Sequence, residues 1–261
     1  MLCNSKAWYN MTVAEYDYLQ TVDVMLMRNI LNAPQATPKE MLYLELGCLP
    51  FRHIIKNKRL SFLHYLLNED PQSMVHRFLR TQIENRNTKD WTTTVLKDIE
   101  EMDIKMNFEE IKAAKQSTFS SLISKKINEN ALKSLNLLKA KHSKVLHLKH
   151  EFLIMKKYLK PNSMKVKKEE KQTIFKLRCR TTDLKTNFKG VYDFWECSAC
   201  GLEEESQKHI LECSVLLSLN EESEETPNYA NLFEGDIEDQ MKIAKQFIDN
   251  MEIKTNLSKN D

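Results

Sequence analysis

The sequence predicts an all-α protein: a multi-helix domain followed by a small CCHC zinc knuckle and a C-terminal helix. Only four Gly and six Pro occur among 261 residues, while Leu, Lys, Glu, Asn and Met are abundant, a balance that favours helix. Apolar residues recur at helical spacing in several stretches, and convincing period-two alternation is lacking, which argues against a sheet of any size. Three Cys and one His near residue 200 have the spacing of a zinc-binding motif.

Helix signals are clear in the first third of the chain. A capping box at residues 12–15 opens the first helix, and residues 37–40 open a second that Gly47 ends. Further helices open at Pro50 and at Pro71. The corner at Gly47 could be a DNA-reading helix-turn-helix, although plain packing explains most such corners. In the third helix the apolar residues are expected inside and four basic residues largely outside: Arg52, Lys56, Lys58 and Arg59.

The remaining helices follow from the same periodicity. They are expected over residues 91–102, after a capping signal at Asn107, and over residues 117–141, the longest amphipathic stretch. Beyond the zinc motif, we expect a helix that ends at Leu219 and then an acidic linker over residues 221–228. An amphipathic helix is expected over residues 229–251, and the last ten residues are expected to be frayed. Four consecutive regions result: helical residues 1–88, helical and basic residues 89–190, the knuckle at 191–219, and the linker with the C-terminal helix at 220–261.

The net charge of +2 hides an asymmetry. Residues 139–189 carry sixteen Lys or Arg against four acids, whereas residues 196–240 carry thirteen acids against one Lys. Such a basic segment is typical of a polyanion-facing surface, and a solvated helix face is the alternative. Interleaved aromatic rings, among them Phe175, Phe188, Tyr192, Phe194 and Trp195, could stack on bases or fill the core. We expect phosphate contacts from six residues: Lys139, Lys141, Lys144, Lys176, Arg178 and Arg180.

The zinc motif consists of two ligand pairs. Cys197 and Cys200 are separated by two residues, which suits one tight turn, and Gly201 helps such a turn by adopting a positive φ. His209 and Cys213 are at positions i and i+4, so on a helix they share a face one turn apart. Turn and helix together predict a tetrahedral shell of three sulfurs and one nitrogen around a structural zinc ion.

Other interpretations of these residues stay open. The cysteines could be reduced core residues beside an unrelated histidine. A catalytic metal would need a coordination position open to water, and four protein ligands leave none. The basic segment contains three histidines, His142, His147 and His150. A second metal site among them would lack thiol or carboxylate partners apart from Glu151.

The rest of the sequence indicates an intracellular protein of the nucleus or cytoplasm. Six cysteines are too few for a disulfide scaffold, and we expect Cys3, Cys48 and Cys179 to be packing residues. The first residues lack the basic and apolar regions of a signal peptide, and no stretch approaches a membrane span. No membrane partner is therefore expected.

Several sequence blocks occur in a characteristic order along nearly the whole chain, at residues 7–12, 37–47, 138–145, 175–180, 207–213 and 229–245. Together they resemble the region C-terminal to the polymerase core in animal non-LTR (LINE-like) retrotransposon reverse transcriptases. The run QKHILEC at 207–213 is similar to the QEHLLxC end of that family's cysteine–histidine motif. Cys179 differs, because the family more often has a small hydroxyl residue there.

The resemblance implies a helical region that follows the polymerase thumb, lies against template RNA or target DNA, and uses its zinc knuckle in nucleoprotein assembly or target-primed reverse transcription. It implies RNA, DNA and the remainder of the reverse transcriptase as partners. The sequence contains no YxDD or comparable aspartate pair for a two-metal polymerase site, and no endonuclease segment. We therefore expect a non-catalytic, nucleic-acid-binding fragment. The alternatives are a zinc-stabilised protein-interaction module without a nucleic-acid role and a polymerase subunit completed by another chain.

Overall fold

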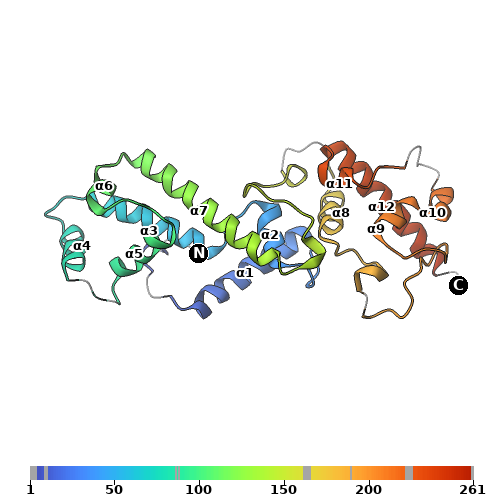
Figure 1. Ribbon diagram of the computed structural model, residues 1–261, viewed down its shortest axis with the longest axis horizontal. Helices are drawn as coiled ribbons and strands as arrows, with labels where there is room; N and C mark the ends of the chain where they lie inside the picture. Colours follow the sequence, from blue (N-terminus) through green and yellow to red (C-terminus); the bar gives the residue numbers. More distant parts are fainter. Residues whose placement is uncertain are drawn as a thin grey trace. The chain divides into compact units, whose positions relative to one another are not determined.

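The computed structural model describes residues 5–8, 11–85, 87, 89–160, 166–188, 190–220 and 226–259. Their regular secondary structure is helical (Figure 1), and the one β-type pairing among them is an isolated antiparallel bridge between Glu196 and Glu204. The predicted all-α fold is confirmed. None of the helices in these residues combines the length and apolarity that a membrane span requires.

The chain forms two compact units that interleave along the sequence. Unit 1 comprises Met1–Met25, Gly47–Leu137 and His150–Leu153; unit 2 comprises Leu26–Leu46, Leu138–Lys149 and Ile154–Asp261. The four consecutive regions expected from the sequence do not coincide with these units, because α1 (Val13–Leu31) and α7 (Gln116–Lys139) each contribute to both.

Unit 1 is built around α3 (Phe51–Leu67). This helix contacts the short η1 (Ser5–Ala7), α4 (Met74–Glu84), α5 (Trp91–Glu101) and α6 (Phe108–Ala113). Buried apolar side chains from α3, α5, α6 and α7 form one core, which includes Leu60, Leu63, Val95, Ile111, Phe119, Ile123 and Ile127. The unit therefore depends on apolar contacts between helices that are distant in the sequence.

Two basic residues of α3 lie in this interior, contrary to expectation. Lys56 and Arg59 are only 3% and 2% exposed. Arg59 Nη2 lies 2.6 Å from Oδ2 of Asp98 on α5, and Lys56 Nζ lies 3.7 Å from Oδ1 of the same carboxylate and also pairs with Glu101. The prediction of an outward position is wrong for both residues, because α5 supplies the opposite charge without which burial would be prohibitive.

Unit 2 has α12 (Ile237–Leu257) at its centre, packed against α8 (Lys168–Cys179), α9 (Gln207–Glu212), α10 (Ser214–Leu219) and α11 (Asn231–Glu234). The amphipathic stretch expected over residues 229–251 is two helices separated at Gly235. The second continues to residue 257, so the expectation of a frayed last ten residues is wrong for most of them. Residues 221–225 of the expected linker lie outside the described residues.

A buried polar network fixes α2 (Lys39–Leu46) inside unit 2. The fully buried Glu45 accepts a hydrogen bond of 2.6 Å from Tyr158 Oη in η3 (Lys157–Leu159). It also accepts hydrogen bonds from Nε and Nη2 of Arg178 on α8, at 3.1 and 3.2 Å. The arginine neutralises the carboxylate, so three segments that are far apart in sequence meet without an unpaired charge.

Candidate metal centre and nucleic-acid interface

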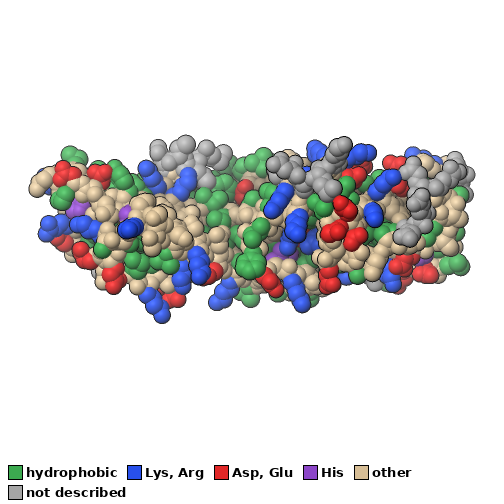
Figure 2. All heavy atoms as spheres, turned by 90° about the horizontal axis from the view of Figure 1, so that it is seen from above, with side chains coloured by type: hydrophobic (Ala, Val, Ile, Leu, Met, Phe, Trp, Pro, Cys, Tyr) green, Lys and Arg blue, Asp and Glu red, His purple; other side chains and the backbone are tan. Residues whose placement is uncertain are grey.

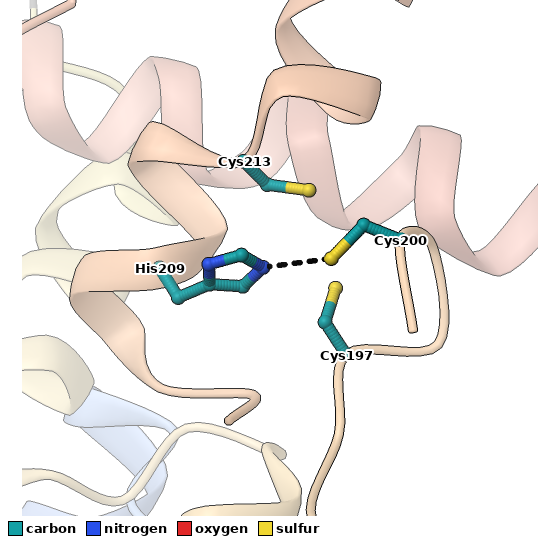
Figure 3. Close-up of side chains that lie close together, drawn as sticks. All are labelled: Cys197, Cys200, His209 and Cys213. Carbon is teal, nitrogen blue, oxygen red and sulfur yellow. Dashed lines mark hydrogen bonds between the residues drawn. The ribbon is translucent and has the colours of Figure 1, made fainter. Parts of the chain in front are cut away.

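Four side chains of unit 2 converge on one point (Figure 3). Cys197 and Cys200 come from a hairpin turn, His209 from α9, and Cys213 from the junction between α9 and α10. One ligand atom from each lies within 4.8 Å of all the others. The predicted grouping of these four residues is therefore confirmed, and within the described part of the chain it is the one such group of Cys, His, Asp or Glu.

The hairpin is shaped by main-chain hydrogen bonds across the turn. The Cys197 N–H donates to Glu203 O at 2.7 Å, and the Glu205 N–H donates to Trp195 O at 2.6 Å. At the tip, the Gly201 N–H donates to Cys197 O at 2.8 Å, and Gly201 has a φ of +66°, which favours glycine. The turn thus holds the first two sulfurs on the same side, as its spacing predicted.

The other two ligands are positioned by helix α9. The Ser206 hydroxyl caps this helix by accepting a hydrogen bond of 3.1 Å from the His209 N–H. Cys213 ends α9 and is also the residue before the first turn of α10. One helical turn separates His209 from Cys213, so the imidazole and the thiol face the hairpin together.

The surroundings of two of the thiols shift their pKa values in opposite directions, favouring the ionised form of Cys200 and the neutral form of Cys213. Burial raises the pKa of Cys200, but hydrogen bonds, among them those from the main-chain N–H groups of Leu202 and Glu203, outweigh it and lower the pKa to about 7. Burial raises the pKa of Cys213 to about 11, against the effect of N–H groups in the first turn of α10. N–H groups directed at sulfur stabilise a thiolate, which is the form that binds a metal.

The donor set and its dimensions fit zinc. Bond lengths of about 2.3 Å to sulfur and 2.0–2.1 Å to nitrogen place the donor atoms of a tetrahedral shell roughly 3.5–3.8 Å apart. The observed limit of 4.8 Å is somewhat wider, so small side-chain movements would complete the shell. With four protein ligands and no open position, such a site would be structural.

Glu205 belongs to the site, although the Cys–His spacing of the zinc motif did not predict it. Its side chain is 1% exposed, and Oε2 accepts hydrogen bonds from the N–H and the hydroxyl of Ser198, inside the CxxC turn, at 3.3 and 3.1 Å. Oε1 accepts from the Lys185 N–H at 3.3 Å and lies 2.7 Å from Lys254 Nζ on α12. This one carboxylate therefore joins the ligand turn to the core of unit 2. Its only sequence signal is its place in a run of three glutamates.

Two of the six expected phosphate contacts are buried, and the prediction is wrong for them. Arg178 pairs with Glu45, 133 residues away in the sequence, and donates from Nη1 to Leu232 O at 3.0 Å. Lys139 is 6% exposed, and its ammonium donates to the main-chain oxygen of Leu148. Both cations satisfy acceptors in the interior, so neither is available to a phosphate on the surface.

The other four basic residues remain accessible. Lys141, Lys144 and Arg180 are exposed, and Lys176 is half-buried in a pocket lined by both polar and apolar side chains between α8 and α12. Figure 2 shows Lys and Arg side chains interspersed with Asp and Glu on the visible face, rather than a field of one sign. A nucleic-acid contact on this face would therefore be local.

Lys144 connects this basic segment to the residues before the knuckle. Its ammonium donates to the main-chain oxygen of Asn187 in η4 (Lys185–Phe188) and lies 5.6 Å from the ring centre of Phe188. η4 is bound in turn to the hairpin, since the Thr186 hydroxyl donates to Glu205 O at 2.8 Å. The knuckle, η4 and the basic segment thus form one continuous set of contacts.

The aromatic residues expected near the basic segment divide into two groups. Phe175 is fully buried and belongs to the core, whereas Phe188 is half-buried beneath Lys144. Tyr192, Phe194 and Trp195 are exposed, Phe194 by 75%. The exposed rings lie in the segment that leads into the hairpin, so they are accessible to a molecule that binds at the knuckle.

Comparisons with protein-family models, with curated proteins and with solved structures find no match to this chain. The fold and the site define a helical protein with a Cys₃His cluster that can hold a metal ion.

Proposed function

We propose that the protein binds RNA or DNA as a non-catalytic segment of a non-LTR retrotransposon reverse transcriptase, and that a structural zinc ion organises its binding surface. The observation that carries this proposal is the contact of Lys144 with η4, because it joins the basic segment to the zinc knuckle. The ordered sequence blocks that resemble the reverse transcriptase family support the parentage.

Cys197, Cys200, His209 and Cys213 would hold the zinc. The ion would fix the hairpin against α9, and Glu205 would pass that order to η4 through Lys185 and Thr186. No chemical step is assigned to the metal: it binds four side chains and stabilises their fold.

The binding surface proposed here comprises Lys141, Lys144 and Arg180, with Lys176 at its edge. Cations at these positions would contact phosphates and release counterions, which makes binding weaker at high salt. Phe188 and the exposed rings that follow it would offer faces on which unpaired bases can stack. The geometry therefore favours a single-stranded ligand.

Filter binding of the purified chain to single-stranded RNA and DNA at two salt concentrations tests the proposal. The double variant Lys141→Glu/Arg180→Glu should bind more weakly, and its salt slope should fall by roughly 1.4 because two phosphate contacts to a single strand are lost. The matched control, Lys112→Glu/Lys133→Glu, changes two exposed lysines of unit 1 and should bind like the wild type. Binding that is absent, salt-independent or equally weakened in the control would contradict the proposal.

The surface of the knuckle favours a second candidate function, the capture of a protein partner. Val191, Phe194 and Leu202 are 75–83% exposed, and Asp193, Glu196, Glu203 and Glu204 lie among them in the sequence. Apolar anchors surrounded by carboxylates suit a basic peptide and repel phosphate. Arg180→Glu separates the two functions, since it should weaken nucleic-acid binding and leave protein capture intact.

A further inference from the structure

We infer that Glu203 is a positioning residue of the metal centre, which contacts two of the four ligands and selects the imidazole nitrogen that binds the metal. This role rests on the zinc site proposed above. Glu203 lies at the start of the returning arm of the hairpin, three residues after Cys200, and is not itself one of the four ligands.

The side chain of Glu203 determines which nitrogen of the His209 ring carries the proton. Its Oε2 lies 3.2 Å from His209 Nδ1. A carboxylate can only accept in this pair, so Nδ1 must be the donor and carry the proton. In a neutral imidazole the other nitrogen, Nε2, is then left with its lone pair free.

Nε2 is the nitrogen that faces the thiols. It lies 3.3 Å from Cys200 Sγ, and Figure 3 shows it directed into the space that the three sulfurs surround. A metal ion there would meet the lone pair of Nε2, while Glu203 would bind the opposite side of the ring. A carboxylate hydrogen-bonded in this way fixes the ring orientation and makes the ligand nitrogen more basic.

The main chain of the same residue contacts a second ligand. Glu203 O accepts the 2.7 Å hydrogen bond from the Cys197 N–H. This contact does not depend on the side chain. Substitution of Glu203 therefore removes the contact with His209 and leaves the hairpin able to form.

The expected effect is moderate. Loss of an outer partner of a metal-bound histidine costs roughly 10–100-fold in metal affinity. The Glu203 side chain is 74% exposed, so water partly screens its charge, and we expect about tenfold, the lower end of that range.

Zinc affinity, measured by competition with a chromophoric chelator, tests this role in the full-length chain. Glu203→Ala should bind zinc about tenfold more weakly than the wild type. Glu203→Gln should recover part of the loss, because its amide oxygen still accepts from Nδ1. Glu204→Ala is the matched control: it removes the neighbouring exposed carboxylate, which makes no hydrogen bond or ion pair with a ligand among the described residues, and should leave affinity unchanged.

NMR of the zinc-bound wild type supplies a readout that a purely structural role would not move. The His209 ring should carry its proton on Nδ1 and bind zinc through Nε2. Equal zinc affinity of wild type and Glu203→Ala, or zinc bound through Nδ1, would overturn the role of Glu203 alone. A wild-type chain that took up no zinc would overturn both this role and the proposed metal site.

Discussion

Among the residues outside the four ligands, Glu205 joins the turn that carries two of them to the core of unit 2. It is buried and receives hydrogen bonds from Ser198 and Lys185, while Lys254 supplies the compensating charge. Because Gln keeps the shape but loses the charge, Glu205→Gln leaves the Lys254 ammonium poorly compensated. Breaking one partner of a buried pair costs about 3–5 kcal/mol.

Denaturant unfolding in the presence of zinc measures this loss, with Glu204→Gln as the exposed control. We expect the control to stay within about 0.5 kcal/mol of the wild type. Equal free energies of unfolding for Glu205→Gln and the wild type would show that the carboxylate does not hold the knuckle to α12.

Arg180 allows stability and binding to be separated. It ends α8 with a φ of 52°, in the left-handed region that costs a non-glycine residue roughly 1 kcal/mol. Arg180→Gly should therefore raise the melting temperature slightly and yet weaken nucleic-acid binding. Thermal unfolding and filter binding of the same preparation measure the melting temperature and the nucleic-acid affinity. A fall in both the melting temperature and the affinity would indicate that Arg180 is mainly structural.

His53 in unit 1 gives stability a pH dependence. Burial lowers its pKa from 6.5, against the effect of the hydrogen bond with Asn130, and its Nδ1 has no hydrogen-bond partner among the described residues. The unfolded chain thus binds a proton more readily, so stability is fully present above pH 6.5 and falls as the pH drops through the lower, folded-state pKa. Denaturation series should show this slope in the wild type and a shallower slope in His53→Gln. An unchanged slope would contradict the assignment.

At the scale of elements, the corner between α11 and α12 depends on Gly235. A Cβ atom there would lie 2.5 Å from Asn231 O and 2.7 Å from Asn231 Cβ. Gly235→Ala should therefore destabilise unit 2 by about 1–3 kcal/mol through overpacking. Gly190→Ala is the control, since nothing lies within 4 Å of its added Cβ. Equal denaturation midpoints for the two variants would contradict the packing at this corner.

Helix starts were the most predictable elements, because their signals are local. The capping residues Thr12 and Asn107 form the expected hydrogen bonds with Glu15 and Glu110. The Cys₃His cluster was predictable for the same reason, since seventeen consecutive residues contain all four of its members.

Contacts between distant segments could not be predicted in this way. Arg59 donates a hydrogen bond to Asp98, which is 39 residues away in the sequence, and Arg178 donates to Glu45, which is 133 residues away. Periodicity assigns basic residues to the outside of a helix, and only the tertiary partner reverses that assignment. The break at Gly235 was missed because the apolar pattern continues across it.

At the scale of the whole molecule, the two units differ in what should stabilise them. Unit 1 has an apolar helical core, whereas unit 2 contains the knuckle, whose short helices α9 and α10 span six residues each. Such short elements would gain much of their stability from the proposed zinc ion. Zinc removal should therefore lower the stability of unit 2 and leave unit 1 close to its original stability.

Native mass spectrometry of the purified, reduced chain, before and after treatment with a chelator, tests the proposed metal centre most directly. We predict one zinc ion per chain, which is lost with the chelator and is absent from a Cys197→Ser/Cys213→Ser variant. Thermal unfolding should show a lower melting temperature for unit 2 after the zinc is removed. A wild-type chain that carries no zinc, or that loses it without any change in the unfolding of unit 2, would contradict the account.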